Sequence, residues 1–305
     1  MADWGLVAIR FAIYADLMLL VGLAAFPLYS FTRSEREDRA ILPLGGTLVW
    51  LALAALPLSG AGFAISSAAM MGLPVNALDF TMLASMASDT EQGAAFLVRM
   101  ASLLATLAAL VLLRQSQTPR YVVAVVGGSI ALATLLWSGH AAATEGALGI
   151  IHRVSDIAHM IAAAIWIGGI AAFGLVLARP VQGEVYVTLA TRLLADFARV
   201  GTAAVAIILL TGLFNGYAIL GAEITKLFQS TYGLLLAAKL VLFAAMLSLA
   251  GNNRWRLTPA LERAAASDRS EATWTRLRIS VALETAAGAT ILALVAWLGT
   301  LAPAN

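Results

Sequence analysis

The sequence predicts an all-α fold: a polytopic integral membrane bundle of about eight transmembrane helices. Composition is the first reason, because hydrophobic residues make up 61% of the 305 residues and charged residues only 12%. A globular protein carries about a quarter charged residues, so this chain has half the usual polar covering. The second reason is a mean hydropathy of +0.89. The third is that apolar stretches of spanning length recur along the whole chain.

Eight stretches reach or approach the length of about 20 apolar residues that a transmembrane helix needs. We expect them to form a single membrane domain, residues 1–305. The first stretch has neither a basic start nor a small-residue cleavage site, so we interpret it as a retained helix. The predicted helices are Trp4–Phe31, Ile41–Met71, Ala94–Leu113, Tyr121–Trp137, Leu148–Leu177, Leu189–Leu220, Tyr232–Ala250 and Ile279–Leu301.

Arginines gather in alternate connections, which predicts the topology. The even-numbered loops hold almost no basic residue, Lys226 being the exception. The positive-inside rule therefore places the arginine-rich loops in the cytoplasm and both termini on the outer, periplasmic side. These short clusters do not resemble a nucleic-acid-binding stripe. The arginines are Arg33, Arg36 and Arg39, then Arg114 and Arg120, then Arg179 and Arg192, then Arg254, Arg256, Arg263, Arg269, Arg276 and Arg278.

Two connections are long enough to carry structure of their own. The outer loop Gly72–Gly93 is expected to form a small cap over the outer face. The inner loop Asn252–Arg276 is expected to contain a short amphipathic helix at the membrane interface. The chain has no cysteine. Disulfides, thiolate metal ligands and cysteine nucleophiles are therefore excluded.

All three histidines fall within twenty residues of one another. His152, Asp156 and His159 are spaced i, i+4, i+7, which places them on one face of the fifth helix. His140 lies at the outer end of the fourth helix, one short loop away. Imidazole and carboxylate groups suit copper, zinc, iron and nickel. Ionisable residues inside a membrane usually mark an ion pathway. The pattern favours a metal site over the alternative, in which these side chains only link helices by hydrogen bonds.

The pattern around these residues also resembles a known family. The run Ser138-Gly139-His140-Ala141 is followed by His152-x3-Asp156-x2-His159-x6-Trp166-x-Gly168-Gly169. This arrangement resembles the CopD/PcoD family of copper-resistance proteins of the bacterial inner membrane. Supporting matches are Thr211-Gly212 with Asn215, Tyr232-Gly233 with Lys239, Asn253-Arg254, and Glu284 with Leu298-Gly299-Thr300-Leu301.

The resemblance implies copper transport or handling across the inner membrane, in copper homeostasis or resistance. The ion would be accepted from the periplasmic side, often from a small periplasmic copper-binding protein. His140, His152, Asp156 and His159 become the candidate copper-site residues. The family is also expected to have a histidine in the first helix, where this chain offers Tyr14 and Asp16 instead.

Methionines could add thioether ligands for Cu(I). The candidates are Met70, Met71, Met82 and Met86 in and near the outer loop, with Met160 a weaker one beside His159. Methionine commonly fills gaps in apolar cores, so packing is the simpler interpretation of each. The histidine set then favours Cu(II), or Cu(I) held by two histidines.

Four charged residues lie inside apolar stretches and should pair or face a wet cavity. They are Asp16, Arg99, Lys239 and Glu284. Because Lys239 and Glu284 belong to the last two helices, we expect them to form a buried ion pair.

Two other classes of function remain as alternatives. A membrane haem protein would use the same histidines as axial ligands. His152 and His159 are about 10 Å apart along the helix and cannot bind one iron together. An enzyme is the weakest alternative, because no H-E-x-x-H motif, nucleophile elbow or phosphate loop is present. We therefore expect no enzymatic activity.

Overall fold

The computed structural model describes residues 3–38, 41–138, 146–178, 183–220, 230–257, 259–260 and 270–301. This part of the chain is helical and contains no strand, and eight of its helices are long and apolar enough to cross a membrane. The predicted fold class, a polytopic α-helical membrane bundle, is confirmed. The spanning helices are α1 (Trp4–Ser30), α3 (Leu44–Met71), α5 (Glu91–Leu112), α6 (Gln117–Ala133), which continues as η2 (Thr134–Ser138), α7 (Gly146–Leu177), α8 (Gly183–Leu220), α9 (Thr231–Asn252) and α11 (Ser270–Leu298).

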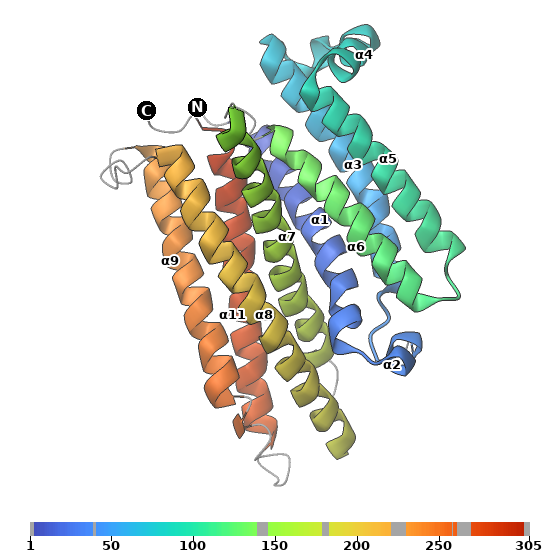
Figure 1. The fold of residues 1–305 in the computed structure, drawn as a ribbon, viewed down its shortest axis with the longest axis vertical. Helices are drawn as coiled ribbons and strands as arrows, with labels where there is room; N and C mark the ends of the chain where they lie inside the picture. The colour runs from blue at the N-terminus through green and yellow to red at the C-terminus, as the bar shows by residue number, and fades with distance from the viewer. Residues whose placement is uncertain are drawn as a thin grey trace.

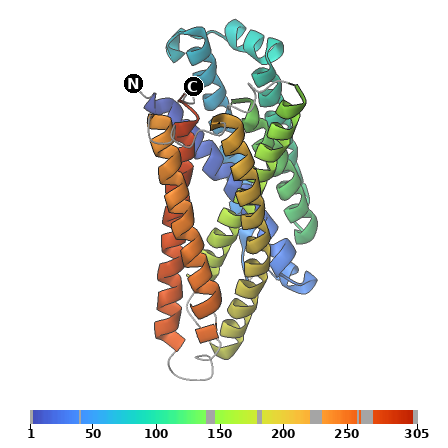
Figure 2. The same cartoon turned by 60° about the vertical axis from the view of Figure 1, so that its left-hand side comes forward.

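Helix α1 lies at the centre of the bundle (Figure 1). It packs against α3 and α6 on one side and against α7 and α11 on the other. Helices α8 and α9 complete the side away from α3, as the turned view shows (Figure 2). The backbones of α1 and α7 meet at Gly22 and Gly168, where a Cβ on Gly168 would lie 2.2 Å from the Cα of Gly22. Small residues allow such close crossings in membranes.

A cap covers the end of α3 and α5, as the length of the outer loop predicted. Helix α3 stops at Gly72, which adopts the left-handed conformation (φ 65°) that favours glycine. The short turn η1 (Val75–Ala77) and the helix α4 (Phe80–Asp89) follow. The side chain of Asp79 caps α4 by accepting a hydrogen bond from the backbone N–H of Met82 (2.8 Å). Helix α4 lies at the same end of the bundle as the start of α1 and the end of α11 (Figure 1).

The opposite end is held together by α2 (Arg33–Glu37). Arg36 donates a hydrogen bond to the carbonyl of Phe31 (2.7 Å), just beyond the end of α1. Glu35 accepts from Arg192 of α8 (2.6 Å) and from the backbone of Thr32 (2.8 Å). Partial burial acts to raise the pKa of Glu35, but these hydrogen bonds outweigh it and hold the pKa below its usual value. The arginine-rich loop therefore also joins helices.

The inner connection before α11 differs from the prediction. Helix α9 continues as a π-helical turn, η5 (Asn253–Leu257), and most of the predicted interfacial helix lies outside the described residues. Helix α11 begins at Ser270 rather than at residue 279. Its first turns are held by packing on one face, since Trp274 is 2% exposed and Arg278 donates to the carbonyl of Leu177 (2.6 Å).

Candidate metal centre

The predicted stripe on α7 lines one cavity. His152, Asp156 and His159 all face a space of about 230 Å³, which we call the histidine cavity. Helices α1, α8, α9 and α11 supply its other walls. His152 lies about 9 Å along the helix from the start of α7, and His159 about 20 Å. The stripe therefore descends from the end that carries α4 towards the middle of the bundle. His140 lies outside the described residues.

Helix α8 orients His159. The Nδ1 atom of His159 lies 2.9 Å from the hydroxyl of Thr211, and that hydroxyl donates its own proton to the carbonyl of Ile207 (2.5 Å). In the tautomer that carries the proton on Nδ1, His159 donates to this hydroxyl, and Nε2 keeps its lone pair available to a ligand. Metal-binding histidines are commonly fixed in this way by a partner on the other ring nitrogen.

Asp156 lies between groups that hold its carboxylate. Its Oδ1 atom accepts a hydrogen bond from the amide of Asn215 on α8 (3.2 Å). It is also close enough to Lys239 and Tyr232 of α9 for an electrostatic interaction. Lys239 lines the histidine cavity. The carboxylate is thus positioned either as an oxygen ligand or as a counter-charge for a cation.

The predicted ion pair between Lys239 and Glu284 is wrong. No ion pair joins them in the described part of the chain, and Glu284 instead accepts a hydrogen bond from Asn253. Asn253 lies fourteen positions beyond Lys239, about 21 Å along the same helical run. Because α9 and α11 are antiparallel neighbours, Glu284 meets the far end of α9 and Lys239 is left facing Asp156.

The histidine cavity does not hold a preformed set of metal ligands among the described residues. Within the described ranges, no three side chains among histidine, aspartate and glutamate lie close enough together to hold a metal ion. His152 is 2% exposed, with its ring edge-on to Phe214 (6.3 Å between centroids). The three predicted residues of α7 therefore share a cavity without converging on one point. Any ion held there needs ligands from other elements.

Two methionine thioethers add possible metal ligands to the predicted set of histidines and aspartate. Met18 of α1 and Met160 of α7 are both buried and both line the histidine cavity. Met160 was a weak candidate, and Met18 could not be identified from the sequence because its approach depends on α1 packing beside α7. In the first helix, Tyr14 lines the cavity, whereas Asp16 is not among its lining residues. The outer-loop methionines Met70 and Met82 are exposed and do not line it.

Two further cavities continue towards the other end of the bundle. The middle cavity, about 380 Å³, shares His159 and Lys239 with the histidine cavity and reaches Trp166. The inner cavity, about 290 Å³, begins on the other side of Trp166 and reaches Glu284 and Asn253. The Trp166 ring stands edge-on to Phe243, with centroids 5.6 Å apart. The side chain of Trp166 therefore lies between the middle and the inner cavity.

Comparison with known proteins places these features in a family. The family model "Copper resistance protein D-like, N-terminal domain" matches residues 1–150, and "Copper resistance protein D" matches residues 191–298. Copper resistance protein D of Pseudomonas syringae pv. tomato is 40% identical over 300 residues, covering 97% of this chain and 96% of that protein. This chain belongs to the copper resistance protein D family. It is a multi-pass membrane protein of that family, as the apolar stretches and the histidine motif predicted.

A second relative is more distant. Copper transport protein CutJ of Bacillus subtilis (strain 168) is 36% identical over 139 residues, which are 45% of this chain and 25% of that protein. No solved structure matches the chain. Both relatives are named for copper resistance or copper transport. Copper handling is therefore the activity that the family supports, and the haem alternative has no support from these relatives.

Proposed function

We propose that this chain transports copper across the bacterial inner membrane and takes the ion from the periplasmic side into the histidine cavity. The observation that carries the proposal is the lining of that cavity. Two imidazoles, one carboxylate and two thioethers share about 230 Å³ in a membrane protein without cysteine. Copper is the cargo here, and the protein acts as a transporter rather than an enzyme.

The ligand types favour Cu(I) as the ion that is carried. Thioether sulfur prefers Cu(I), and imidazole accepts both oxidation states. Met18, Met160 and the Nε2 atom of His159 are the ligands we assign to the deeper part of the cavity. His152, with His140 from the neighbouring segment, would receive the ion nearer the surface. Asp156 supplies the compensating negative charge.

The three successive cavities support a route through the bundle. An ion leaving His159 would enter the middle cavity, pass Trp166 and reach the Asn253–Glu284 pair at the other end. Buried polar groups in a membrane are costly and typically mark such pathways. Trp166, which lines both the middle and the inner cavity and stands edge-on to Phe243, would close the route between them. Rotation of one of these rings would open it.

The arginine distribution supports the orientation. The α2 end is rich in arginine and would face the cytoplasm, so the α4 cap and the mouth of the histidine cavity would face the periplasm. A small periplasmic copper-binding protein, the partner that the family resemblance implies, would deliver its ion at this end.

Copper titration of the purified protein tests the site. Cu(I) and Cu(II) are titrated against a competing chelator. The thermal stability of each variant without copper is measured as a check on folding. Loss of a direct ligand in His159→Ala or Met160→Leu should weaken Cu(I) binding more than loss of an orienting partner does. Losing such a partner typically costs about 10–100-fold in affinity. Met82→Leu in the cap is the matched methionine control and should bind as wild type.

Thr211→Val tests the tautomer assignment. This change removes the acceptor of the His159 Nδ1 proton and should weaken copper binding by about 10–100-fold without removing a ligand. Thr285→Val is the control, because Thr285 bonds only the carbonyl of Val281 in its own helix. If Met82→Leu weakens binding while the His159, Met160 and Thr211 variants bind as wild type, the site is in the cap and the proposal fails.

Transport is tested separately in proteoliposomes. The purified protein should accelerate Cu(I) movement into vesicles, and His159→Ala should abolish the acceleration. Cellular copper content at fixed external copper then gives the direction. Accumulation on expression supports uptake from the periplasm, whereas depletion contradicts it.

A further inference from the structure

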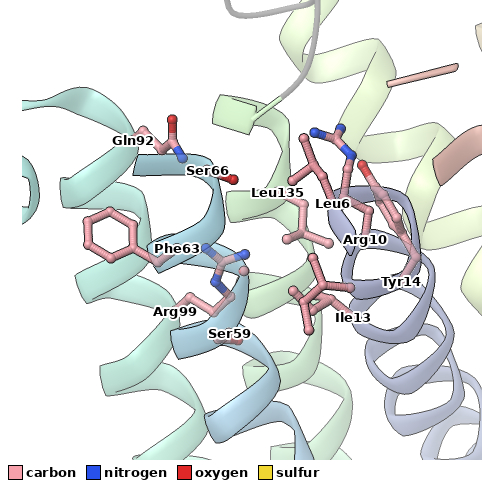
Figure 3. A pocket seen from close by; sticks show the side chains of 12 residues that line it. Leu6, Arg10, Ile13, Tyr14, Ser59, Phe63, Ser66, Gln92, Arg99 and Leu135 are labelled. Carbon is pink, nitrogen blue, oxygen red and sulfur yellow. The ribbon is translucent and has the colours of Figure 1, made fainter. Parts of the chain in front are cut away.

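A fourth, smaller cavity lies between α1, α3 and α5 (Figure 3). Its volume is about 30 Å³, which is room for about two water molecules or one monatomic ion. Two arginines line it, Arg10 of α1 and Arg99 of α5. The hydroxyls of Tyr14, Ser59 and Ser66 and the amide of Gln92 complete its polar lining. We call it the arginine cavity.

Arg99 is a buried cation without a counter-ion. It is 4% exposed and lies about 12 Å along α5 from the start of the helix, too deep to extend into water. Its Nε atom is buried without a hydrogen-bond partner, and among the described residues Arg99 forms no ion pair. The Oγ atom of Ser59, on a residue that is fully buried, also lacks a partner. Two unsatisfied donors therefore line the same small space.

The lining contains no group that could neutralise this charge. The described residues around the cavity include neither aspartate nor glutamate. A charge in a low-dielectric environment is costly unless it is paired and hydrogen-bonded. Water could satisfy the donors, but it would leave the charge of the guanidinium uncompensated. An anion satisfies both the donors and the charge.

We propose that the arginine cavity binds one small inorganic anion of the size of chloride. Arg99 and Ser59 would donate to it directly, and Arg10 and Tyr14 of α1 line the same cavity across from them (Figure 3). The size of the cavity favours a monatomic ion over a phosphate group, which carries four oxygens. Charge-assisted hydrogen bonds of this kind are short and about twice as strong as neutral ones.

The anion site adjoins the histidine cavity. Arg10 and Tyr14 line both spaces. On its other side Arg10 packs against Gly299 of α11, where any Cβ would lie 2.4 Å from the guanidinium. A cation entering the histidine cavity meets the positive charges of Arg10 and Lys239 and the single carboxylate of Asp156. An anion held by Arg99 would place a negative charge near this wall of the histidine cavity and reduce that repulsion.

Thermal stability in a neutral detergent tests the proposal without copper. Wild-type protein is compared in sodium chloride and in sodium gluconate at equal ionic strength. A ligand that binds only the folded state raises the Tm, by about 5–10 °C at a hundredfold excess over Kd. Chloride and bromide should each raise the Tm of the wild type relative to gluconate. Crystals grown in bromide should show an anomalous peak beside Arg99.

Two variants and two controls test whether the chloride response depends on the arginine cavity. Arg99→Met removes the uncompensated charge, so it should lose the chloride response and be at least as stable as wild type in gluconate. Ser59→Ala should reduce the response without altering the fold. Arg120→Met and Ser102→Ala should keep the full response, because Arg120 donates to the carbonyl of Gly45 and Ser102 to that of Gly127.

Three results would overturn the proposal. The first is an equal Tm of the wild type in chloride and gluconate with no stabilisation by an anionic phospholipid, which would mean that water fills the cavity. The second is a chloride response that persists in Arg99→Met. The third is stabilisation by an anionic phospholipid with no response to chloride, which would assign the site to a lipid headgroup. None of these measurements involves copper, so their outcome is independent of the transport proposal.

Discussion

The crossing of α1 and α7 offers the sharpest test of the fold. An ideal Cβ on Gly168 would lie 2.2 Å from the Cα and 2.4 Å from the carbonyl carbon of Gly22. Ordinary carbon contacts are about 3.5 Å, so Gly168→Ala forces the two helices apart by about 1.3 Å. The obstructing atoms are backbone and cannot rotate away. Overpacking of this kind costs about 1–3 kcal/mol, and we expect the upper end of that range.

The expected change is a fall in Tm of about 6–12 °C, since 1 kcal/mol corresponds to about 2–4 °C in a protein of this size class. Copper affinity should fall with it, because α1 brings Met18 and Tyr14 to the cavity wall. Gly174→Ala is the matched control on the same helix, since its Cβ would lie an ordinary 3.5 Å from Val281. Alanine has a higher helix propensity than glycine, so the Tm of Gly174→Ala should be unchanged or slightly raised. Equal Tm values for Gly168→Ala and Gly174→Ala would refute the reasoning.

Three further expectations concern topology and charge. In spheroplasts, an impermeant thiol reagent should label Ser88→Cys in the cap and not Ser34→Cys in α2; the reverse pattern would invert the topology. Glu35→Gln should lower stability by about 0.2–1 kcal/mol, because it loses a partly exposed ion pair with an arginine of α8. The pKa of Glu35 is lowered, so its contribution should be present above about pH 4.5 and be lost as the pH falls through the folded-state pKa. Thermal unfolding of Lys239→Met, Glu284→Gln and the double variant should be additive, and strong coupling would contradict the separation of these residues.

The spanning helices could be predicted because hydropathy measures what a bilayer selects. The predicted and observed starts of α1, α3 and α9 agree within three residues. The start of α11 could not be predicted in this way, because its first nine residues are polar on average. They are helical through packing, with Trp274 and Leu277 buried. Hydropathy reports where a helix meets lipid, not where a helix begins.

The candidate site was predictable along one helix and not between helices. The i, i+4, i+7 spacing was enough to place His152, Asp156 and His159 on one face of α7. Met18 and the true surroundings of Lys239 depend on which helices are neighbours, and no local pattern carries that information. The ion pair predicted from charge alone failed for the same reason. Glu284 meets Asn253 because antiparallel packing fixes which ends of α9 and α11 lie together.

The position of α1 explains why the two halves of the chain depend on each other. The family models divide the chain into residues 1–150 and 191–298, yet the histidine cavity takes Met18 from the first part and Lys239 from the second. Helix α7, which carries His152, Asp156 and His159, lies almost wholly between the two matched regions in sequence and packs against helices of both. Because Arg10 lines both the histidine cavity and the arginine cavity, any shift of α1 moves Met18 and this positive charge at the histidine cavity together. The close Gly22–Gly168 contact is therefore a geometric requirement of the histidine cavity as well as of the fold.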